Sequence, residues 1–398
     1  MQFDVAIVGG GIVGLATAYQ MQKQNPKLNL ILFEKEDELA FHQSGRNSGV
    51  IHSGLYYKTG SMRSKNCVYG RDLLIEYAKK SKISYDICGK IVVANNYNEL
   101  QTLRKLKTNG EKNGLTGLVI LDSNQTKEIE PHVDVLSSLY VPQSGIIDYK
   151  QVAKQFAKDI VSINKNSHIR LSCKVLDYNN QNIKTDIGNF KAKNIIFCGG
   201  LFADRLAKKD GLNLTMKTVG FRGDYFKLKE NSSYKVKNLI YPVPNPAFPF
   251  LGIHLTRMIN GEIECGPNAV FTFKREGYKK TDFNISDTIN ALCFKGTMKL
   301  FINNWKFGLK EYQRAFSKSL FLKELKKMIP TLKIDDIEPA RSGVRAIALE
   351  KNGYILDDFK IVNNKSNIHV LNAPSPAATA CLAIGENIMN EARKCFNI

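Results

Sequence analysis

A chain of 398 residues is long enough for two or three domains, and its hydrophobic share of 43% is typical of a globular protein. No apolar run is long enough to span a bilayer, and no basic region precedes the first apolar residues, so we expect neither a membrane-spanning helix nor a signal peptide. The eight scattered cysteines form no CxxC pair, which argues against a secreted, disulfide-stabilised protein. We therefore predict a cytoplasmic location. The formal net charge of +20 comes from lysines dispersed among Asn and Ser, a pattern that predicts no nucleic-acid partner. An anionic substrate, or peripheral contact with the inner face of a membrane, is the alternative reason for the charge. The six histidines lack metal-ligand spacing, so we predict no metal.

The chain opens with the pattern of a dinucleotide-binding βαβ unit. A β-branched run over 5–8 ends in Gly9-x-Gly11-x-x-Gly14, a helix is expected to follow, and a second strand over 28–33 ends at Glu34. In this pattern the first glycine permits a tight turn, the second lets the backbone approach a pyrophosphate, and the third lets the helix pack on the strand. The helix N-terminus offers N–H groups to phosphates, and Glu34 can accept hydrogen bonds from ribose hydroxyls. The motif alone fits NAD and FAD equally.

The next segment, residues 42–57, reads HQSGRNSGVIHSGLYY. It is dense in groups that bind phosphates and flavin edges. Ser44, Asn47 and Ser48 can donate to or accept from a pyrophosphate or a ribityl chain, and Arg46 is a charge-assisted phosphate partner. We therefore expect this loop to contact the cofactor.

Alternating helices and strands follow. Apolar spacing predicts helices over 67–80, 99–110 and 151–163, a strand over 89–95, and a strand pair over 169–178 and 182–190. A buried strand over 194–200 then ends in Gly199-Gly200, with a helix expected over 202–208. This second strand–glycine–helix geometry is either another close approach to the cofactor or an ordinary βα turn.

The second half of the chain changes character. Short strands broken by Pro and Gly are expected over 225–228, 238–243, 248–255 and 262–270, which indicates an antiparallel sheet in a separate domain. Residues 283–330 are expected to be helical, strands to return near 354–356 and 369–371, and a last helix to follow Ala377. The nucleotide domain is therefore expected to be discontinuous.

Several unbroken motifs, in one order along nearly the whole chain, closely resemble the L-2-hydroxyglutarate dehydrogenase/oxidase family of the FAD-dependent D-amino-acid oxidase-like superfamily. They are the glycine fingerprint, HQSGRNSGVIHSGLYY, GFRGDY (220–225), FPFLGIH (248–254), CGPNAV (265–270), FKREGY (273–278), GVRA (343–346) and NAPSPAAT (372–379). Two positions depart from the family pattern. The family often has Gln where this chain has Ile347, and some members have Thr-Pro-Arg where it has Thr256-Arg257-Met258.

The resemblance implies an α/β fold with a Rossmann-like FAD-binding domain and an inserted α+β substrate domain built on an antiparallel sheet. We assign residues 1–84, 146–214 and 336–398 to the FAD-binding domain and residues 85–145 and 215–335 to the substrate domain. The resemblance also implies oxidation of L-2-hydroxyglutarate to 2-oxoglutarate, with hydride transfer to flavin N5 and electrons passed to oxygen, a quinone or another acceptor. The expected partners are a small dicarboxylic hydroxy acid and that acceptor.

Such chemistry needs a base for the hydroxyl proton and cations for the carboxylates. The first candidate base is His254 and the second is His52, because a neutral imidazole titrates in the right range. The residues expected to contact substrate are Tyr56, Tyr57, Arg222 and Tyr225. Lys274 and Arg275 are weighed as carboxylate or flavin partners, but we expect them to be solvated surface charges. The residues expected to bind FAD are Gly9, Gly11, Gly14, Glu34, Lys35, Ser44, Arg46, Asn47, Ser48, Val175, Gly199, Gly200, Arg345, Pro374, Ala377 and Thr379.

Two rival functions are compatible with parts of this pattern. One is another FAD-dependent amino-acid, amine or hydroxy-acid oxidase of the same superfamily, because fold alone does not separate these chemistries. The other is a basic FAD-containing protein that binds RNA or a membrane, for which a concentrated basic stripe with aromatic residues would be expected.

Overall fold

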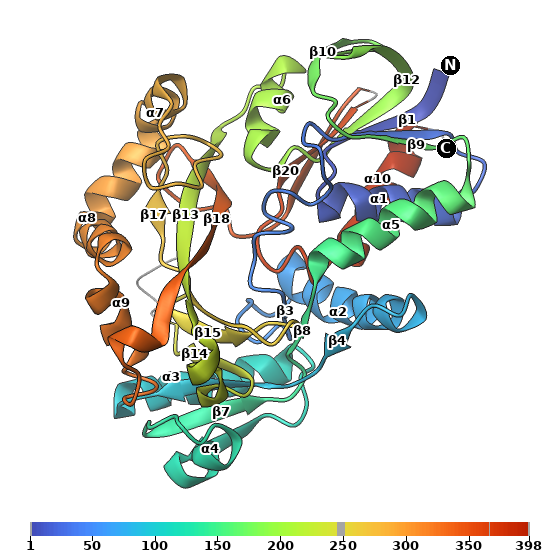
Figure 1. The fold of residues 1–398 in the computed structure, drawn as a ribbon. Helices are drawn as coiled ribbons and strands as arrows, with labels where there is room; N and C mark the ends of the chain where they lie inside the picture. The colour runs from blue at the N-terminus through green and yellow to red at the C-terminus, as the bar shows by residue number, and fades with distance from the viewer. Residues whose placement is uncertain (1, 245–250, 366, 397–398) are drawn as a thin grey trace.

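The computed structural model describes residues 2–244, 251–365 and 367–396, and two large sheets dominate it (Figure 1). The first sheet has the order β10-β11-β12-β1-β2-β9, with β20 beside β12 and β19 beside β20. Its strands are β1 (Gln2–Val8), β2 (Leu30–Phe33), β9 (His168–Arg170), β10 (Val175–Asn179), β11 (Asn182–Thr185), β12 (Gly188–Phe197), β19 (Lys360–Asn364) and β20 (Asn367–Asn372).

The centre of this sheet is parallel and buried. Strands β9, β2, β1, β12 and β20 run parallel, with Val8 opposite both Phe33 and Phe197. Both faces of these strands are covered, so their side chains form continuous apolar runs rather than an alternating pattern. The helices that pack around this part are α1 (Ile12–Gln24), α2 (Met62–Lys80), α5 (Tyr149–Ile163), α6 (Ala203–Lys209) and α10 (Cys381–Phe396).

The second sheet has the order β17-β13-β16-β15-β14-β5-β7-β6, with β18 paired along β13. Most of its pairs are antiparallel, whereas β14 and β5 run parallel. Its strands are β5 (Lys90–Ala94), β6 (Val119–Asp122), β7 (Ser137–Val141), β13 (Met216–Leu228), β14 (Leu239–Pro242), β15 (His254–Arg257), β16 (Ile263–Gly266), β17 (Val270–Phe271) and β18 (Ile337–Glu350).

Helices cover the outside of this second sheet. In Figure 1 α7, α8 and α9 stand in a column beside β17, β13 and β18, and α3 and α4 lie near β7. Their bounds are α3 (Tyr97–Lys112), α4 (Ser123–Ile129), α7 (Ile285–Leu292), α8 (Lys295–Phe316) and α9 (Lys318–Leu325). A small sheet of β3 (Val50–Ile51), β8 (Gly145–Ile147) and β4 (Tyr85–Asp86) and three 3₁₀ turns, η1 (Gly200–Phe202), η2 (Glu230–Lys235) and η3 (Ile334–Asp336), complete the described elements.

The predicted fold class, an α/β Rossmann-like domain with an inserted α+β unit, is confirmed. Several local predictions differ from the structure. The strand expected over 182–190 is divided between β11 and the start of β12. The strand expected over 169–178 is two strands, β9 and β10, and the one over 262–270 divides into β16 and β17 around Pro267, which has no N–H for a ladder. Residues 354–356 form no strand, only one isolated bridge between Leu349 and Ile355. Of the strand expected over 248–255, residues 248–250 lie outside the described residues.

The division of the chain into domains by residue ranges stays a prediction. Strand β18 is the element that bears on it. The ranges assign β18 to the FAD-binding domain, yet it pairs with β13 of the second sheet from Met216–Glu350 to Leu228–Ile337. The two sheets are therefore joined by a strand whose chain continues directly toward β19 and β20 of the first sheet.

Candidate active site

A cavity of about 2010 Å³ is lined by elements of both sheets. Pockets for drug-sized ligands are about 300–1,000 Å³, so this space suits a dinucleotide together with a small substrate. Its walls include the glycine turn after β1, the loop after β2, the turn after β12, and residues of β13, β15 and β18.

The glycine turn between β1 and α1 leaves the backbone bare toward the cavity. Gly9 has φ +119°, and a Cβ there would lie 2.4 Å from the carbonyl oxygen of Cys198. A Cβ at Gly14 would lie 2.1 Å from the carbonyl oxygen of Gly9. Both positions therefore exclude side chains. Helix α1 points its N-terminus at the cavity, and Ser44 Oγ accepts a hydrogen bond of 2.9 Å from the N–H of Ile12. This end of α1 fits a pyrophosphate.

Glu34 closes the same turn at the end of β2. Its carboxylate is 7% exposed and accepts hydrogen bonds from the N–H of Gly10 (2.8 Å) and the N–H of Glu36 (3.0 Å). Glu34 also lines the cavity. The carboxylate therefore holds the glycine turn against the end of β2 and borders the position that the fingerprint assigns to the ribose.

We expect Glu34→Gln to weaken FAD binding by about 1–3 kcal/mol, because an amide presents a donor where two backbone N–H groups need acceptors. Titrating the apoprotein with FAD and following flavin fluorescence measures the loss. Asp37→Asn, an exposed change three residues away, is the control. Equal affinities for the wild type and Glu34→Gln would contradict this role.

The loop after β2 is held in place from several sides. The Arg46 guanidinium lies 4.2 Å from the Tyr278 ring centroid and 5.0 Å from that of Phe41. Arg341 donates from Nη1 to the Gly45 carbonyl (2.9 Å) and from Nη2 to the Asn47 carbonyl (2.8 Å). The Asn47 amide is used within the loop, since it donates to the carbonyls of Gln43 and Ser44 and accepts from the N–H of Gly49. The loop therefore presents a fixed backbone to the cavity.

Most residues predicted for FAD and substrate line the cavity. Those that do are Gly9, Gly11, Gly14, Glu34, Lys35, Ser44, Arg46, Asn47, Ser48, His52, Tyr56, Tyr57, Val175, Gly199, Gly200, Tyr225, His254, Arg345, Pro374 and Ala377. The bare glycine turns, the end of helix α1 and the Glu34 carboxylate lie together at one part of this cavity and fit the phosphates and ribose of FAD.

Two predicted residues lie elsewhere. Thr379 is fully buried behind the wall, where its Oγ1 accepts from the N–H of His52 (3.1 Å) and contacts the Tyr149 hydroxyl (2.9 Å). Thr379 therefore positions the His52 segment and does not line the cavity. Arg222 is buried on Asp224, with Nε 2.7 Å from Oδ1, and donates from Nη1 to the Lys279 carbonyl. The expected substrate contact of Arg222 is not supported, because an internal carboxylate already holds the guanidinium.

Arg275 is a further correction. It is not a solvated surface charge: its guanidinium and the Asp204 carboxylate form an ion pair with side chains only 6% and 2% exposed. Arg275 Nη2 lies 2.9 Å from Asp204 Oδ2, and Nη1 also donates to the Leu201 carbonyl. The pair ties the loop after β17 to α6, directly after the Gly199–Gly200 turn. Lys274 is exposed, as expected.

The two candidate bases both face the cavity, and His254 has the better-defined ring. Its Nδ1 lies 2.8 Å from the Gly252 carbonyl oxygen, which must accept, so Nδ1 carries the hydrogen and Nε2 the lone pair. The ring stacks on Tyr241 with centroids 4.0 Å apart. Burial lowers the pKa of His254 to about 4, and Arg345 and Lys90 add to this effect. Burial likewise lowers the pKa of His52 to about 3, with Lys90 and His254 contributing. Both imidazoles are neutral at pH 7.

A buried cation lies behind the cavity wall. Lys90, at the start of β5, is 1% exposed, and its Nζ lies 4.5 Å from the Tyr56 ring centroid and 5.0 Å from that of Tyr241. Burial lowers the pKa of Lys90 to about 7. Sequence reasoning missed both Lys90 and Tyr241. The one available signal was a lysine at the head of the apolar strand Lys90–Ala94.

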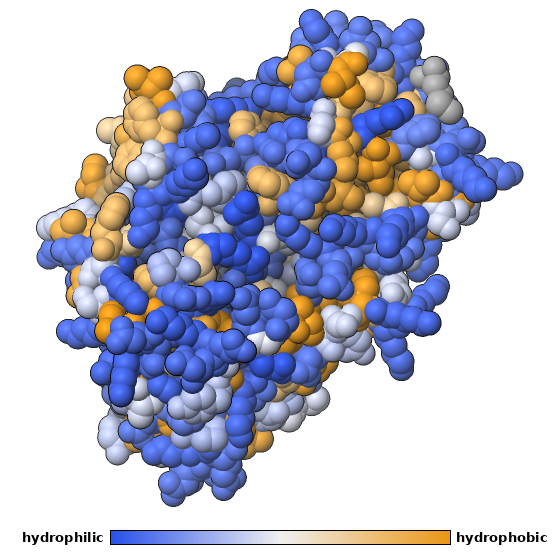
Figure 2. Space-filling view, viewed as in Figure 1, coloured by the Kyte–Doolittle hydropathy of each residue, from blue (hydrophilic) through white to orange (hydrophobic). Residues whose placement is uncertain are grey.

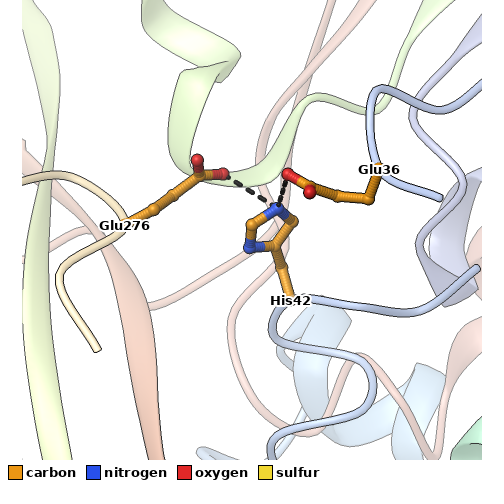
Figure 3. Close-up of side chains that lie close together, drawn as sticks. All are labelled: Glu36, His42 and Glu276. Atoms are coloured by element: carbon orange, nitrogen blue, oxygen red, sulfur yellow. Dashed lines mark hydrogen bonds and ion pairs between the residues drawn. The ribbon is translucent and has the colours of Figure 1, made fainter. Parts of the chain in front are cut away.

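The far edge of the cavity carries an ion-pair cluster (Figure 3). His42 Nε2 lies 2.9 Å from Glu36 Oε1 and 3.1 Å from Glu276 Oε1, and Nδ1 lies 2.6 Å from the Tyr278 hydroxyl. These ligand types are grouped closely enough to hold a metal. However, Lys35 Nζ already lies 2.6 Å from Glu276 and 2.8 Å from Glu36. The Lys35 ammonium supplies the positive charge, so the cluster joins Glu276, in the loop after β17, to the loop after β2.

These features define a flavoprotein oxidoreductase. The model of the FAD-dependent oxidoreductase family matches residues 4–390, and the chain belongs to that family and uses FAD. Within it the chain belongs with the L-2-hydroxyglutarate dehydrogenases. It is 44% identical to L-2-hydroxyglutarate dehydrogenase of Indibacter alkaliphilus over 100% of both chains. It is 40% identical to that of Escherichia coli over 98% of this chain and 93% of the relative. It is also 40% identical to the mitochondrial enzyme of Homo sapiens, over 100% of this chain and 90% of the relative.

Solved structures share the fold. The L-alpha-glycerophosphate oxidase of Mycoplasma pneumoniae, determined with FAD bound, aligns with a TM-score of 0.78 at 24% identity over 100% of this chain and 95% of that one. The glycine oxidase of Geobacillus kaustophilus aligns with a TM-score of 0.74 at 16% identity, over 99% and 95%. At these identities the likeness concerns the fold alone.

Proposed function

We propose that this protein oxidises L-2-hydroxyglutarate to 2-oxoglutarate. The full-length relatives named for that substrate support the proposal, and one feature of the cavity carries it: a neutral His254 with a directed Nε2 lone pair lines the cavity together with Arg345 and Tyr225. Oxidation of the alcohol removes the hydroxyl proton and the hydrogen at C2 with its electron pair. Bound FAD supplies the acceptor for that hydride.

The chain's own residues have separate tasks in this reaction. His254 Nε2 accepts the hydroxyl proton, and the bond from Nδ1–H to the Gly252 carbonyl stabilises the imidazolium that forms. Arg345, on β18, lines the cavity and donates to the Asn268 carbonyl (3.1 Å), and its Coulomb effect reaches His254. We assign Arg345 as the cation that faces a substrate carboxylate. Tyr56 and Tyr225 complete the wall, and the buried Tyr56 hydroxyl has no protein partner in the described part of the chain.

Lys90 acts as a positioning residue. It touches the site only through the rings of Tyr56 and Tyr241, yet its charge lies where little water screens it. A dianionic substrate in the cavity favours the charged form of Lys90, and the charged form in return favours the dianion. Lys90 therefore contributes to the preference for a dicarboxylate.

We expect Lys90→Met to raise KM for L-2-hydroxyglutarate on the order of tenfold, with a smaller change for a monocarboxylic 2-hydroxy acid. Because burial lowers the pKa of Lys90 to about 7, the wild-type KM should be lowest below pH 7 and rise above it as the ammonium loses its proton. Lys90→Met should abolish that rise, and Lys90→Arg should keep KM low at pH 9.

Lys58→Met, which removes an exposed charge at the rim of the cavity, is the matched control and should leave this pH profile unchanged. A purely structural role for Lys90 would change stability or kcat without altering the pH dependence of KM.

Anaerobic mixing of the holoprotein with each enantiomer of 2-hydroxyglutarate tests the substrate. The L enantiomer should bleach the flavin much faster than the D enantiomer, because only one of them directs its C2 hydrogen at the flavin while both carboxylates are held. Equal rates, or faster bleaching by glycine or D-alanine, would instead favour an amino-acid oxidase. The acceptor that reoxidises FAD stays a prediction, oxygen or a quinone, as does the cytoplasmic location.

A further inference from the structure

Helix α8 lies at the surface of the molecule, yet it carries a deeply buried carboxylate. Ile302 and Trp305 of α8 are 69% and 61% exposed, and Figure 2 shows apolar residues over α7 and α8 at the upper left. Glu311 lies on the same helix but is only 3% exposed. A buried carboxylate is costly unless it is paired and hydrogen-bonded. The groups that bind Glu311 therefore indicate what this side chain does.

The two carboxylate oxygens of Glu311 contact different parts of the structure. Oε1 accepts from Arg314, which lies three positions further along α8 and has a side chain 21% exposed. Oε2 accepts a hydrogen bond of 2.8 Å from the backbone N–H of Ala269, in the segment between β16 and β17. One oxygen is therefore used within α8, and the other holds a peptide group beside the second sheet.

The peptide group that Glu311 binds is also bound by Arg345. The N–H of Ala269 and the carbonyl of Asn268 belong to one peptide unit. Glu311 accepts from this N–H, and Arg345 Nη1 donates to this carbonyl over 3.1 Å. A carboxylate at the N–H and a guanidinium at the carbonyl polarise the peptide in the same direction, so each hydrogen bond strengthens the other. We call Glu311, the Asn268–Ala269 peptide and Arg345 the peptide relay.

The peptide in the middle of the relay is fixed by its neighbours. Asn268 is 2% exposed, and its side-chain Oδ1 accepts from the N–H of Asp224 (2.7 Å). A Cβ at Gly223 would lie 2.5 Å from Pro267 Cβ, so this segment packs directly against β13. Arg345 comes from β18, which also pairs with β13. Both ends of the relay therefore meet at a peptide that has little room to shift.

Glu311 and Arg345 also act on each other through their charges. Burial lowers the pKa of the Arg345 guanidinium, and the negative charge of Glu311 opposes this effect. Burial raises the pKa of Glu311, and Arg314, the Ala269 N–H and Arg345 oppose that effect in turn. Little water screens these charges, because both side chains are buried. Each group therefore favours the charged form of the other.

We propose that Glu311 is a positioning residue for substrate binding: through the peptide relay it holds the charged guanidinium of Arg345 at the cavity, where Arg345 binds a substrate carboxylate. This role rests on the proposed function, in which Arg345 is that cation. Arg345 lines the cavity, whereas Glu311 does not, so Glu311 acts on the substrate only through Arg345. Loss of the Glu311 charge should therefore weaken substrate binding more than it slows the chemical step.

Titration of the oxidised holoprotein with 2-oxoglutarate, followed by flavin absorbance, measures the affinity for a dicarboxylate. Glu311→Gln keeps an oxygen that can accept from Ala269 but removes the charge, and it should raise Kd on the order of tenfold. The KM for L-2-hydroxyglutarate should rise in parallel, with a smaller change in kcat. The matched control is Tyr312→Phe, which removes another hydrogen bond from α8 to the second sheet, the bond of 2.9 Å to the Phe271 carbonyl. Tyr312→Phe should change Kd by no more than about twofold.

A double-mutant cycle tests whether the effect passes through Arg345. Arg345→Met already lacks the guanidinium, so adding Glu311→Gln to it should weaken binding of 2-oxoglutarate no further. The proposal is overturned if the effects of Arg345→Met and Glu311→Gln add. It is also overturned if Glu311→Gln and Tyr312→Phe weaken binding equally, because the role of Glu311 would then be to anchor α8.

A measurement without substrate separates the relay from the proposed reaction. Phenylglyoxal attacks the neutral form of a guanidine group, and that form is easier to reach once a nearby negative charge is lost. Arg345 should therefore be modified several-fold faster in Glu311→Gln than in the wild type, as measured by mass spectrometry of its peptide. Equal modification rates overturn the relay, whatever the substrate. Faster modification in a protein that L-2-hydroxyglutarate does not reduce would contradict the proposed reaction and still support the relay.

Discussion

Replacing His254 with alanine should slow reduction of the bound FAD by L-2-hydroxyglutarate roughly 10²–10⁴-fold, the usual contribution of a general base. The Gly252 carbonyl fixes the proton on Nδ1, so Nε2 is the proton acceptor of a ring that is neutral at pH 7. The variant should retain FAD, because His254 lies on β15 and the glycine turns that fit the phosphates lie after β1 and β12. Anaerobic stopped-flow absorbance measures the rate.

The pH dependence of the same rate has a defined sign. Because burial lowers the pKa of His254 to about 4, the reactive neutral form predominates at higher pH, and the rate should be nearly constant from pH 6 to 8 and fall as the pH approaches 4. The unreactive form is the protonated one.

His52→Ala serves as the comparison for His254→Ala. The backbone N–H of His52 donates to Thr379 Oγ1, and its loop carries cavity-lining residues that we expect to bind FAD, so this variant should act on binding or flavin geometry more than on the chemical step. Reversed results, a dead His52→Ala and a normal His254→Ala, would exchange the two assignments. Normal rates in both would exclude an imidazole base.

Arg275→Met should lower the free energy of unfolding by about 3–5 kcal/mol, because it leaves the buried Asp204 carboxylate without its counter-ion. Arg275→Met should also make the protein release FAD more readily, because Asp204 lies on α6 just after the Gly199–Gly200 turn that lines the cavity. Denaturant unfolding of the holoprotein, followed by circular dichroism and by flavin release, measures both effects.

Lys274→Met is the matched control for Arg275→Met, because it removes an adjacent but exposed charge and should change stability by no more than about 0.5 kcal/mol. Combining Arg275→Met with Asp204→Leu removes both charges and should recover much of the loss, as apolar replacements of buried ion pairs do. A stable single variant would show that the Asp204 carboxylate is compensated by other groups.

The sequence by itself determined the features that depend on local chain geometry. The turn after β1 requires residues without side chains at Gly9 and Gly14, because a Cβ at either would meet a carbonyl oxygen within 2.4 Å. The alternation of strand and helix, the acidic end of β2 at Glu34 and the loop from Ser44 to Ser48 are likewise contiguous in the chain. Such features were predictable, since a short pattern of residue types specifies each of them.

Long-range pairing was decided by the tertiary structure. Arg275, in the loop after β17, is buried against Asp204 of α6, 71 positions away, whereas Arg222 pairs with Asp224 two positions further along β13. Nothing adjacent to Arg275 in sequence identifies Asp204 as its partner. Lys90 likewise becomes a positioning cation only because β5 carries it beneath Tyr56 and Tyr241.

Helix α8, which packs on one side and exposes Ile302 and Trp305 on another, illustrates the same division. Helical apolar spacing in residues 283–330 predicts helices, and helices α7, α8 and α9 form there. The spacing is the same for a row that packs on a sheet and for a row that meets solvent. Which side of α8 is covered depends on where Val219, Phe221 and Phe271 lie, and those residues belong to β13 and β17. Local sequence sets the periodicity of an apolar face, whereas burial of that face depends on segments distant in the chain that only the folded arrangement brings together.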